Sequence, residues 1–402
     1  MPRNDMIDRR NFLAGSVAGV AGYALSGQAQ GGPAGKKVRY GIVGTGNRGR
    51  NAHLRIVTRY VPEAEVVALC DTTKENLKPA LEAAPGAKGY EDYKKMLASE
   101  PSLDAVIVVV PNFLHADVTV AALQAGKHVL VEKPMAIHLA EADRMIQAAE
   151  KNRRVLVVGQ QSRYSLLYER MAKLIREGAI GELEYVYAAL FRGDWNPASW
   201  RYKDPATGKE TNWRFLTKTA GSALLEDGIH ELDVIHWLVG AHPTRIQANG
   251  GNNVFKDRET IDNAGLLIDF SNGVRCTFGY TIFTPGVPNG RFTRLFGSKA
   301  EMTTEGSKGE AEIVIRPYRG QLERIPVPRL RPDEASFKEQ AGGVDADVET
   351  LRLHKAFVAS IVGNAPVFAD GKVGRDAIHI SLAAERSVRT GQVIPWTQEA
   401  GI

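Results

Sequence analysis

The sequence has little cysteine, no strongly basic block and no apolar run long enough for a membrane helix. Its two cysteines, Cys70 and Cys276, each lie in an apolar run typical of a strand, so we expect two buried thiols rather than a disulfide. No Lys/Arg block interleaves aromatic residues, which gives nucleic-acid binding no support. The apolar run Phe12–Leu25 is shorter than the ~20 residues that cross a bilayer, so we expect no stable membrane anchor.

The overall composition is ordinary for a globular protein, with 44% hydrophobic and 24% charged residues. At roughly 150 residues per domain, the 402 residues predict two to three domains. The net charge is +5, and part of the excess lies in the first ten residues, where Arg3, Arg9 and Arg10 outnumber Asp5 and Asp8. The basic balance therefore belongs partly to a targeting segment.

The N-terminal segment has the order of features found in a twin-arginine export signal. Arg9 and Arg10 precede the apolar run, and Gly27–Ala29 forms a small-residue cleavage site. We therefore predict that residues 1–36 are a signal peptide and linker, and that the twin-arginine machinery exports the folded chain to the periplasm. The alternative is a cytoplasmic protein with an apolar N-terminal helix.

Residues 37–160 are predicted to form a Rossmann domain with a doubly wound parallel sheet. Short, almost wholly apolar strands alternate with helices, which is typical of a parallel sheet covered on both faces. The expected strands are Val38–Val43, Glu65–Asp71, Ala105–Val110, Val129–Val131 and Val155–Val158. The expected helices are Arg50–Tyr60, Ala116–Ala125 and Leu139–Lys151.

Residues 161–402 are predicted to form a substrate-binding α+β domain with a large, mostly antiparallel sheet. Longer strands with partial alternation favour that sheet. They are expected at Glu184–Phe191, Thr244–Gly250, Ala264–Phe270, Val274–Tyr280 and Arg294–Phe296. Helices are expected at Leu166–Glu177, Ser222–Val239, Asp347–Val362 and Val373–Arg389, and the late ones are expected to pack back on the Rossmann domain.

The loop Gly44–Gly49 has the pattern G-x-G-x-x-G between a predicted strand and a predicted helix. Gly44 permits the tight turn, Gly46 lets the backbone approach a pyrophosphate, and Gly49 lets helix and strand pack closely. The helix N-terminus supplies N–H donors to phosphate oxygens. We therefore predict a bound dinucleotide.

An acidic residue sets the predicted choice of dinucleotide. Asp71 lies 22 residues after Gly49 and should accept hydrogen bonds from the ribose hydroxyls, which favours NAD and leaves NADP as the alternative. Asn47 and Arg48 lie inside the glycine loop and are also expected at the cofactor.

Three further motifs carry a family likeness: Pro111–His115, Glu132–Pro134 and Glu226–Asp233. With the glycine loop, they make the chain resemble the Gfo/Idh/MocA oxidoreductase family, which includes glucose–fructose oxidoreductase and inositol dehydrogenase. The likeness runs from about Val38 to Phe296, and the E-K-P element is its most specific part.

The resemblance implies the roles of several site residues. Lys133 would lie beside the nicotinamide and the reacting carbinol, and His230 would be the acid/base residue. Glu226 occupies a position where the family usually has Asp, and Asp227 follows it. The resemblance also places Glu132 and the group Pro111, Asn112 and His115 on the nicotinamide side.

The chemistry of alcohol oxidation agrees with these roles. A base must take the carbinol proton as hydride leaves, and a histidine such as His230 titrates in the useful range. Glu226 lies four residues earlier, where it would share a helix face with His230 and orient it. The Lys133 ammonium would stabilise the developing alkoxide. The spacing of Glu226, His230 and Asp233 would allow a metal site. The sequence has no further ligand cluster, so we expect no bound metal.

The segment Arg192–Phe215 is rich in tryptophan and arginine, and carries Trp195, Trp200, Trp213 and Arg214. Aromatic faces and guanidinium groups suit a sugar, so we predict substrate contacts from Trp195, Trp213, Arg214 and Asp227. A structural loop that packs its own aromatics is the alternative. Arg163 and Tyr164 follow the last Rossmann strand and are also expected at the substrate.

These features predict hydride transfer between tightly bound NAD and a carbinol of a sugar, glycoside or polyol. An exported enzyme must regenerate its nicotinamide in place, either by oxidising one sugar and reducing another or by redox-neutral cleavage. The latter would resemble glycoside hydrolase family 109. A non-catalytic sugar-binding protein remains the alternative of a different class. An exposed sheet face in the second domain favours a homo-oligomer.

Overall fold

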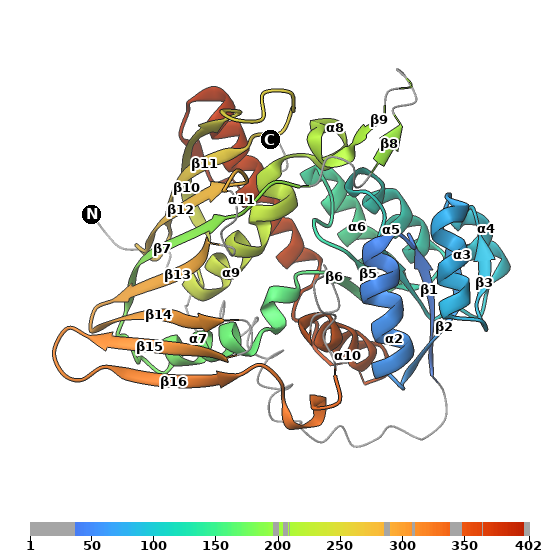
Figure 1. The fold of residues 1–402 in the computed structure, drawn as a ribbon, viewed down its shortest axis with the longest axis horizontal. Coiled ribbons are helices and arrows are strands. Elements are labelled where there is room, and N and C mark those ends of the chain that lie inside the picture. Colours follow the sequence, from blue (N-terminus) through green and yellow to red (C-terminus); the bar gives the residue numbers. More distant parts are fainter. Residues whose placement is uncertain are drawn as a thin grey trace. The chain divides into compact units, whose positions relative to one another are not determined.

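The computed structural model describes residues 37–195, 201–203, 208, 210–284, 290–307, 310–337, 348–363 and 365–397. The predicted export signal and Trp200 lie outside these residues. The described chain divides into two compact units (Figure 1). Unit 1 contains 37–136, 140–165 and 332–375, and unit 2 contains 137–139, 166–331 and 376–397.

Unit 1 is built on a six-stranded parallel sheet in the order β3-β2-β1-β4-β5-β6. Its strands are β1 (Val38–Val43), β2 (Ala64–Cys70), β3 (Lys88–Tyr90), β4 (Ala105–Val108), β5 (His128–Val131) and β6 (Leu156–Val158). Every residue of β4 and β6 is buried, because helices cover both faces of the sheet. The order is that of a dinucleotide-binding sheet, so the predicted Rossmann fold is confirmed.

The helices of unit 1 include one from the far end of the chain. The helices between strands are α3 (Lys74–Ala83), α4 (Tyr93–Ser99), α5 (His115–Gln124), α6 (Leu139–Asn152) and α2 (Arg55–Tyr60), which follows the π-helical turn η1 (Gly49–Leu54). The distant helix α10 (Val348–Val362) packs against α2 and against η3 (Gln161–Tyr164). On α10, Phe357 contacts the Tyr40 ring of β1 at a centroid distance of 5.8 Å. The Rossmann core therefore includes a helix that lies about 200 residues beyond its last strand in the chain.

Unit 2 is built on a nine-stranded sheet in the order β16-β15-β14-β13-β7-β12-β11-β10-β17. All neighbours are antiparallel except β12 and β7. The strands are β7 (Leu183–Phe191), β10 (Pro243–Gly251), β11 (Asn263–Phe270), β12 (Arg275–Thr281), β13 (Gly290–Gly297), β14 (Ala300–Ser307), β15 (Glu310–Pro317), β16 (Glu323–Pro328) and β17 (Ile394–Pro395). The predicted mostly antiparallel sheet is confirmed, although the sequence analysis missed β14 to β17.

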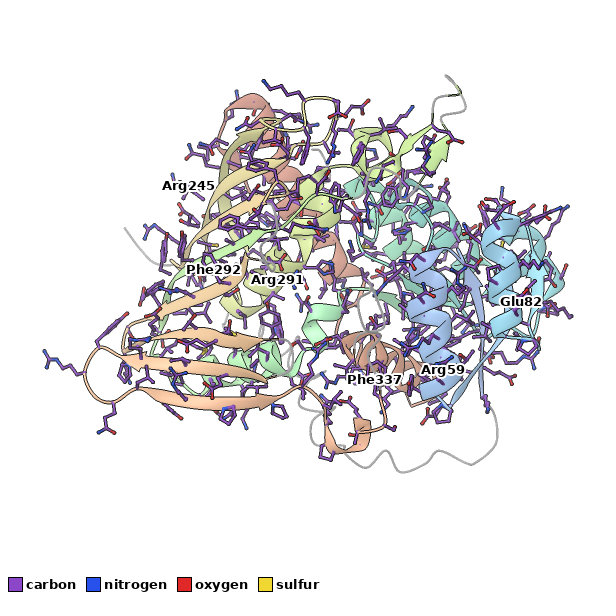
Figure 2. All side chains as sticks on the ribbon, in the orientation of Figure 1. Arg59, Glu82, Arg245, Arg291, Phe292 and Phe337 are labelled. Atoms are coloured by element: carbon purple, nitrogen blue, oxygen red, sulfur yellow. The ribbon has the colours of Figure 1, made fainter. Side chains whose placement is uncertain are left out.

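One face of this sheet is covered and the other carries exposed apolar side chains. Alternate residues of β11 and β12 are buried, as a half-covered sheet requires. Helices α7 (Leu166–Arg176), α9 (Ile229–Val239) and the later part of α11 (Gly371–Thr390) belong to unit 2. On the other face, Tyr187 and Leu267 are 43% and 54% exposed. Phe292, labelled in Figure 2, contacts the Tyr187 ring at a centroid distance of 5.3 Å.

The state of the two cysteines agrees with the expectation from the sequence. Cys70 and Cys276 are both free and buried, as expected, and burial with the nearby Asp71 and Asp92 charges raises the pKa of Cys70 to about 12. Among the described residues, no helix is long and apolar enough to cross a bilayer.

Candidate active site

The glycine loop has the shape that a dinucleotide requires. Gly44 has φ +94°, and a Cβ there would lie 2.1 Å from the Val109 carbonyl oxygen. A Cβ on Gly49 would lie 2.0 Å from the Gly44 carbonyl oxygen. By contrast, a Cβ on Gly46 would meet only the Asn76 amide nitrogen, at 3.9 Å. The first and third glycines are therefore required by the fold, while the second leaves open space where a pyrophosphate would approach the backbone.

Asp71 is held beside this loop at the end of β2. Its Oδ2 accepts a hydrogen bond from the Thr45 backbone N–H at 2.8 Å, and its Oδ1 accepts one from the Thr73 N–H at 2.9 Å. The carboxylate is thus fixed next to the second residue of the loop. These residues fit NAD: a fixed carboxylate can accept ribose hydroxyl hydrogen bonds and would repel a 2′-phosphate.

A buried carboxylate joins the glycine loop to the E-K-P motif. Oε1 of Glu132 accepts hydrogen bonds from Arg48 Nε at 2.7 Å and from His53 Nε2 at 2.8 Å. Its Oε2 accepts one from the Lys133 backbone N–H at 3.0 Å. The Arg48 and Glu132 side chains tie the loop to the E-K-P motif, and their predicted contact with the cofactor stays a prediction.

The same cluster extends to α10. Arg48 donates to the Thr350 hydroxyl at 3.0 Å, and His53 Nδ1 lies 3.0 Å from His354 Nε2. Burial, with the charges of His53 and Arg48, holds the pKa of His354 well below its usual value. A charged His53 can donate from Nδ1 to Nε2 of the neutral His354 and from Nε2 to Glu132. His53 and His354 lie in no sequence motif, so nothing in the sequence indicates them as part of this cluster.

Burial and charge act in opposite directions on Glu132. Burial alone would raise its pKa, but the Arg48 charge and the hydrogen bonds from His53 and Arg48 leave the pKa well below the usual value. The carboxylate therefore stays charged in the folded protein.

His115 holds the next part of this loop. Its Nδ1 lies 2.6 Å from the Pro134 carbonyl oxygen and its Nε2 lies 2.8 Å from the Val110 carbonyl oxygen. Both contacts are hydrogen bonds only if both ring nitrogens carry protons, as in imidazolium. The ring thus links the ends of β4 and β5, where Asn112 is buried and Lys133 is half-buried. Contacts of Pro111, Asn112 and His115 with the nicotinamide stay a prediction.

Arg163 and Tyr164 lie in unit 1, on the turn after β6. Both are buried, and both contact the Phe368 ring: the Arg163 guanidinium at 5.5 Å and the Tyr164 ring at 5.7 Å between centroids. The Tyr164 carbonyl also accepts a hydrogen bond from Arg352 at 3.0 Å. Both residues are therefore packed side chains of unit 1, and their contact with a substrate stays a prediction.

In unit 2, the segment before His230 is a π-helical turn, η5 (Leu224–Gly228), rather than the regular α-helix that we expected. Its i to i+5 hydrogen bonding changes the angle between successive side chains, so the α-helical spacing rule does not apply to Glu226 and His230. The structure shows Glu226 buried and ion-paired to Arg214 at 2.7 Å. His230 is half-buried on the first turn of α9.

The arginine and tryptophan segment packs against this turn. Arg192 pairs with both oxygens of Asp227, at 3.0 and 3.1 Å. The Arg192 and Arg214 guanidinium groups lie 5.8 and 5.6 Å from the centre of the Trp195 ring, and Trp213 lies 5.3 Å from Arg214. Trp195 is only 1% exposed, so its ring supports the two arginines, as in the structural alternative.

The predicted catalytic residues fall into two groups. Lys133 lies in unit 1, while Glu226 and His230 lie in unit 2. The structure describes the residues around each group. That the two groups act on one substrate stays a prediction. Arg192 was not among the predicted site residues, and only its place in the tryptophan-rich segment could have indicated it.

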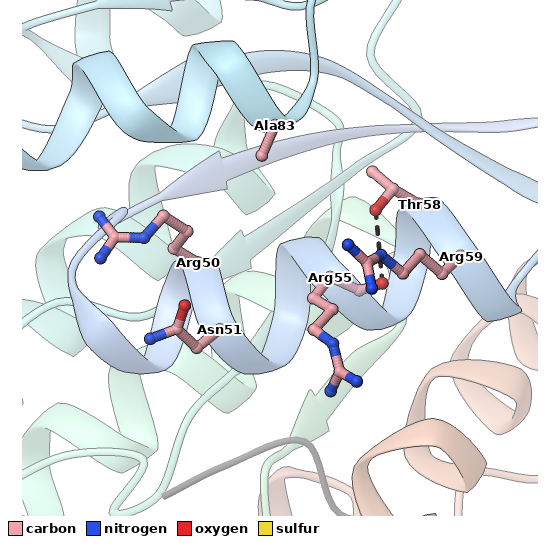
Figure 3. Close-up of a pocket in the computed structure, with 6 residues that line it drawn as sticks. All are labelled: Arg50, Asn51, Arg55, Thr58, Arg59 and Ala83. Carbon is pink, nitrogen blue, oxygen red and sulfur yellow. Dashed lines mark hydrogen bonds between the residues drawn. The ribbon is translucent and has the colours of Figure 1, made fainter. Parts of the chain in front are cut away.

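A separate hollow of about 470 Å³ lies along η1 and α2 and reaches the end of α3. Figure 3 shows its lining residues, which are Arg50, Asn51, Arg55, Thr58, Arg59 and Ala83. It contains none of the predicted catalytic or cofactor residues, and we assign it no part in the reaction.

Two protein-family models match the chain, one within each unit. Residues 38–160 match the model of the oxidoreductase family with an NAD-binding Rossmann fold, and residues 168–303 match the GFO/IDH/MocA C-terminal domain. The inositol 2-dehydrogenase of Salmonella typhimurium is 31% identical over 255 residues, which are 61% of this chain and 70% of that protein. The chain belongs to the Gfo/Idh/MocA family. It is an NAD-dependent oxidoreductase that acts on CH–OH groups.

More distant relatives cover more of the chain. The myo-inositol 2-dehydrogenase of Thermotoga maritima is 23% identical over 90% of this chain and 100% of its own. A levoglucosan dehydrogenase solved with NADH has a TM-score of 0.76 at 21% identity and covers 90% of this chain and 100% of its own. The aldose–aldose oxidoreductase of Caulobacter crescentus has a TM-score of 0.71 at 23% identity, with the same coverage. These structures share the two-part fold.

The glycine loop gives a prediction about cofactor binding. Gly46→Ala should leave the free energy of unfolding unchanged but weaken NADH binding at least about tenfold, or about 1.4 kcal/mol, because the methyl group occupies the pyrophosphate side of the loop. Gly44→Ala should instead lower stability, since its φ is positive and its Cβ would overlap Val109. Urea unfolding and NADH fluorescence titration of stripped protein measure both effects.

Gly86→Ala is the matched control, because a Cβ there has nothing within 4 Å. Tight NADH binding by the Gly46 variant, equal to that of wild type, would contradict the assigned role of the loop.

The buried carboxylate gives a prediction about acid stability. Glu132→Gln leaves Arg48 without its charged partner and should destabilise the protein by about 3 kcal/mol at pH 7. Because the folded-state pKa is lowered, this contribution is full above the unfolded-state pKa of about 4.3 and is lost as pH falls through the lower folded-state value. Urea unfolding from pH 7 to pH 3 should show the two proteins converging, while the exposed control Glu82→Gln stays near wild type throughout.

Proposed function

We propose that this enzyme transfers hydride between tightly bound NAD and a carbinol carbon of a sugar, glycoside or polyol. The observation that carries the proposal is the bonded path from the glycine loop through Arg48 and Glu132 to the Lys133 backbone. It couples the cofactor loop to the residue that the family uses at the reacting carbon. The named activities of the inositol dehydrogenase relatives support a cyclic polyol or sugar as substrate.

The chain's own residues then have distinct tasks. NAD, when bound, accepts the hydride. The Lys133 ammonium stabilises the negative charge that develops on the carbinol oxygen, and His230 takes the proton from that oxygen. Glu226 and Asp227, each held by an arginine, keep a fixed negative charge one turn before His230.

The substrate side of the site is proposed to lie in unit 2 around the paired arginines. Trp195 is buried and acts as their support, and Trp213 is buried as well. The partly exposed Arg214 and Asp227 are therefore the better candidates for direct contact with sugar hydroxyls, and Trp213 remains a proposed contact. Arg163 and Tyr164 remain proposed contacts from unit 1.

Export decides how the cofactor is regenerated. We propose that Arg9 and Arg10 direct the folded, NAD-loaded chain to the periplasm, where free nicotinamide is scarce. A second sugar would then re-oxidise or re-reduce the bound cofactor. Redox-neutral glycoside cleavage, by transient oxidation, elimination and re-reduction, is the second candidate, favoured by the same export signal.

The catalytic assignment predicts two losses of turnover. Lys133→Ala should lower kcat by a factor on the order of 10² to 10³, and His230→Ala by roughly 10² to 10⁴, with NADH binding retained in both. Steady-state kinetics, with the absorbance of the bound reduced nicotinamide as a second signal, measure these effects. The exposed His138→Ala serves as the control.

Full activity in both variants would refute the assignment. Two readouts distinguish the candidate reactions. Sugar-to-sugar transfer makes the nicotinamide absorbance rise with a donor and fall with an acceptor, whereas glycoside cleavage incorporates solvent deuterium next to the transient ketone.

The export signal predicts a change of compartment. Replacing Arg9 and Arg10 together by Lys should retain the precursor in the cytoplasm. Cell fractionation with immunodetection measures this, and a periplasmic mature chain from the double variant would overturn the proposal.

We also propose a homo-oligomer. The exposed Tyr187 and Leu267 on the outer face of the large sheet support it, since apolar side chains on an open face favour burial by another copy. Light scattering of the purified protein gives the mass that tests it.

A further inference from the structure

Three side chains with metal-binding atoms converge at the C-terminal end of α9. His236 lies in the last turn of that helix, and Gly240, with φ +66°, reverses the chain so that His242 returns to the same end. Asp376 comes from α11, the helix labelled in Figure 1, and belongs to the same unit 2 by its contacts. Among the described residues, this is the one group of at least three histidine, cysteine or acidic side chains that lie close enough to hold a metal ion.

We propose that His236, His242 and Asp376 form a binding site for a divalent transition-metal ion, with Zn²⁺ as the first candidate. The group differs from Glu226, His230 and Asp233, whose spacing the sequence analysis considered. It also lies at the opposite end of α9 from His230, so the site is separate from the oxidoreductase chemistry.

The distances fit a site that needs only small side-chain rotations. One ligand atom from each residue lies within 4.8 Å of the other two, and His242 Nδ1 is 3.8 Å from Asp376 Oδ2. Zinc bonds of about 2.0 to 2.1 Å in a tetrahedron place ligand atoms roughly 3.3 Å apart. The ligands must therefore move inward by about an ångström, which rotations of the half-exposed side chains can supply.

The burial of the three residues leaves an entry path. His236 is 4% exposed, whereas the His242 and Asp376 side chains are 28% and 25% exposed. A metal would thus be held from the inside by one imidazole, with its outer side open to solvent. Three protein ligands with a water in the fourth position is a common zinc arrangement.

The chemistry of the ligands selects the class of metal. Two imidazoles with one carboxylate suit Zn²⁺, Cu²⁺ or Ni²⁺, while Mg²⁺ and Ca²⁺ prefer all-oxygen sites. The carbonyl end of α9 also carries the negative end of the helix dipole, which favours a cation there.

A second layer of aromatic residues holds the ligands. The Trp396 ring stacks on His242 with 6.0 Å between centroids, and on His379, one turn after Asp376, at 3.8 Å. The Trp396 backbone N–H donates to the Thr244 carbonyl at 2.9 Å, which fixes the tryptophan beside β10. The stacked ring restrains the orientation of His242, and the apolar shell limits solvent access to that side of the site. A bound ion would join the end of α9, the start of β10 and α11 within unit 2.

Metal binding to the purified full chain tests the proposal. After treatment with a chelator and its removal, wild type should bind Zn²⁺ with one-to-one stoichiometry in calorimetric titration, and its Tm should rise with added Zn²⁺. Co²⁺ should give the strong visible absorption of a four-coordinate site. His242→Ala and Asp376→Asn should each weaken Zn²⁺ binding at least about 100-fold.

The control is His138→Ala, which removes an exposed histidine elsewhere and should leave Zn²⁺ binding at the wild-type level. Circular dichroism checks that each variant folds, and His242→Gln replaces the ring conservatively if the alanine variant does not. The proposal is overturned if wild type binds no Zn²⁺, or if folded His242 and Asp376 variants bind it as tightly as wild type. NADH binding should be equal in all of these proteins, so failure here would leave the proposed oxidoreductase function intact.

Discussion

The charge of Glu132 is the constraint on which the cofactor half of the molecule depends. A buried carboxylate costs several kcal/mol of lost hydration unless partners surround it. Here those partners come from the glycine loop, the following helix turn and the next backbone N–H, and they reach α10 through Thr350 and His354. Satisfying one charge therefore fixes the loop that would bind NAD, the position of the E-K-P motif and the docking of a helix from the far end of the chain.

Unit 2 repeats this principle at the start of α9. Glu226, Asp227 and Glu231 crowd negative charge onto two successive turns, and each pairs with an arginine from a different part of the unit: Arg214, Arg192 and Arg291. Because Glu226 and Glu231 are buried and Asp227 is half-buried, the positions of these carboxylates are restrained by packing as well as by charge. The polar side chains around His230 are thereby ordered before any substrate arrives.

A feature could be predicted from the sequence when neighbouring residues encode it, and could not when it depends on contacts between distant residues. The glycine loop and each Rossmann strand or helix are encoded by patterns within a few residues, Asp71 follows Gly49 at a fixed distance of 22 residues, and the structure confirms the Rossmann fold. The cluster around Glu132 could not be predicted from the sequence. His53 and His354 are 301 residues apart in the chain and come into contact only when α10 packs against the rest of unit 1. Likewise, no sequence pattern distinguishes the π-helical turn before His230 from the α-helix that we expected, and the polar β14 and the proline-containing β16 lack a clear strand pattern.

The two outermost strands of the large sheet restrict how copies of this protein could associate. β16 carries Pro326 and Pro328, which have no backbone N–H to offer to another strand, and β17 is only two residues long. Neither border provides a continuous ladder for an added strand, which protects a nine-stranded sheet from open-ended aggregation. Growth of the sheet by a tenth strand from another molecule is therefore disfavoured, and the proposed homo-oligomer would have to form by side-chain packing on the open face.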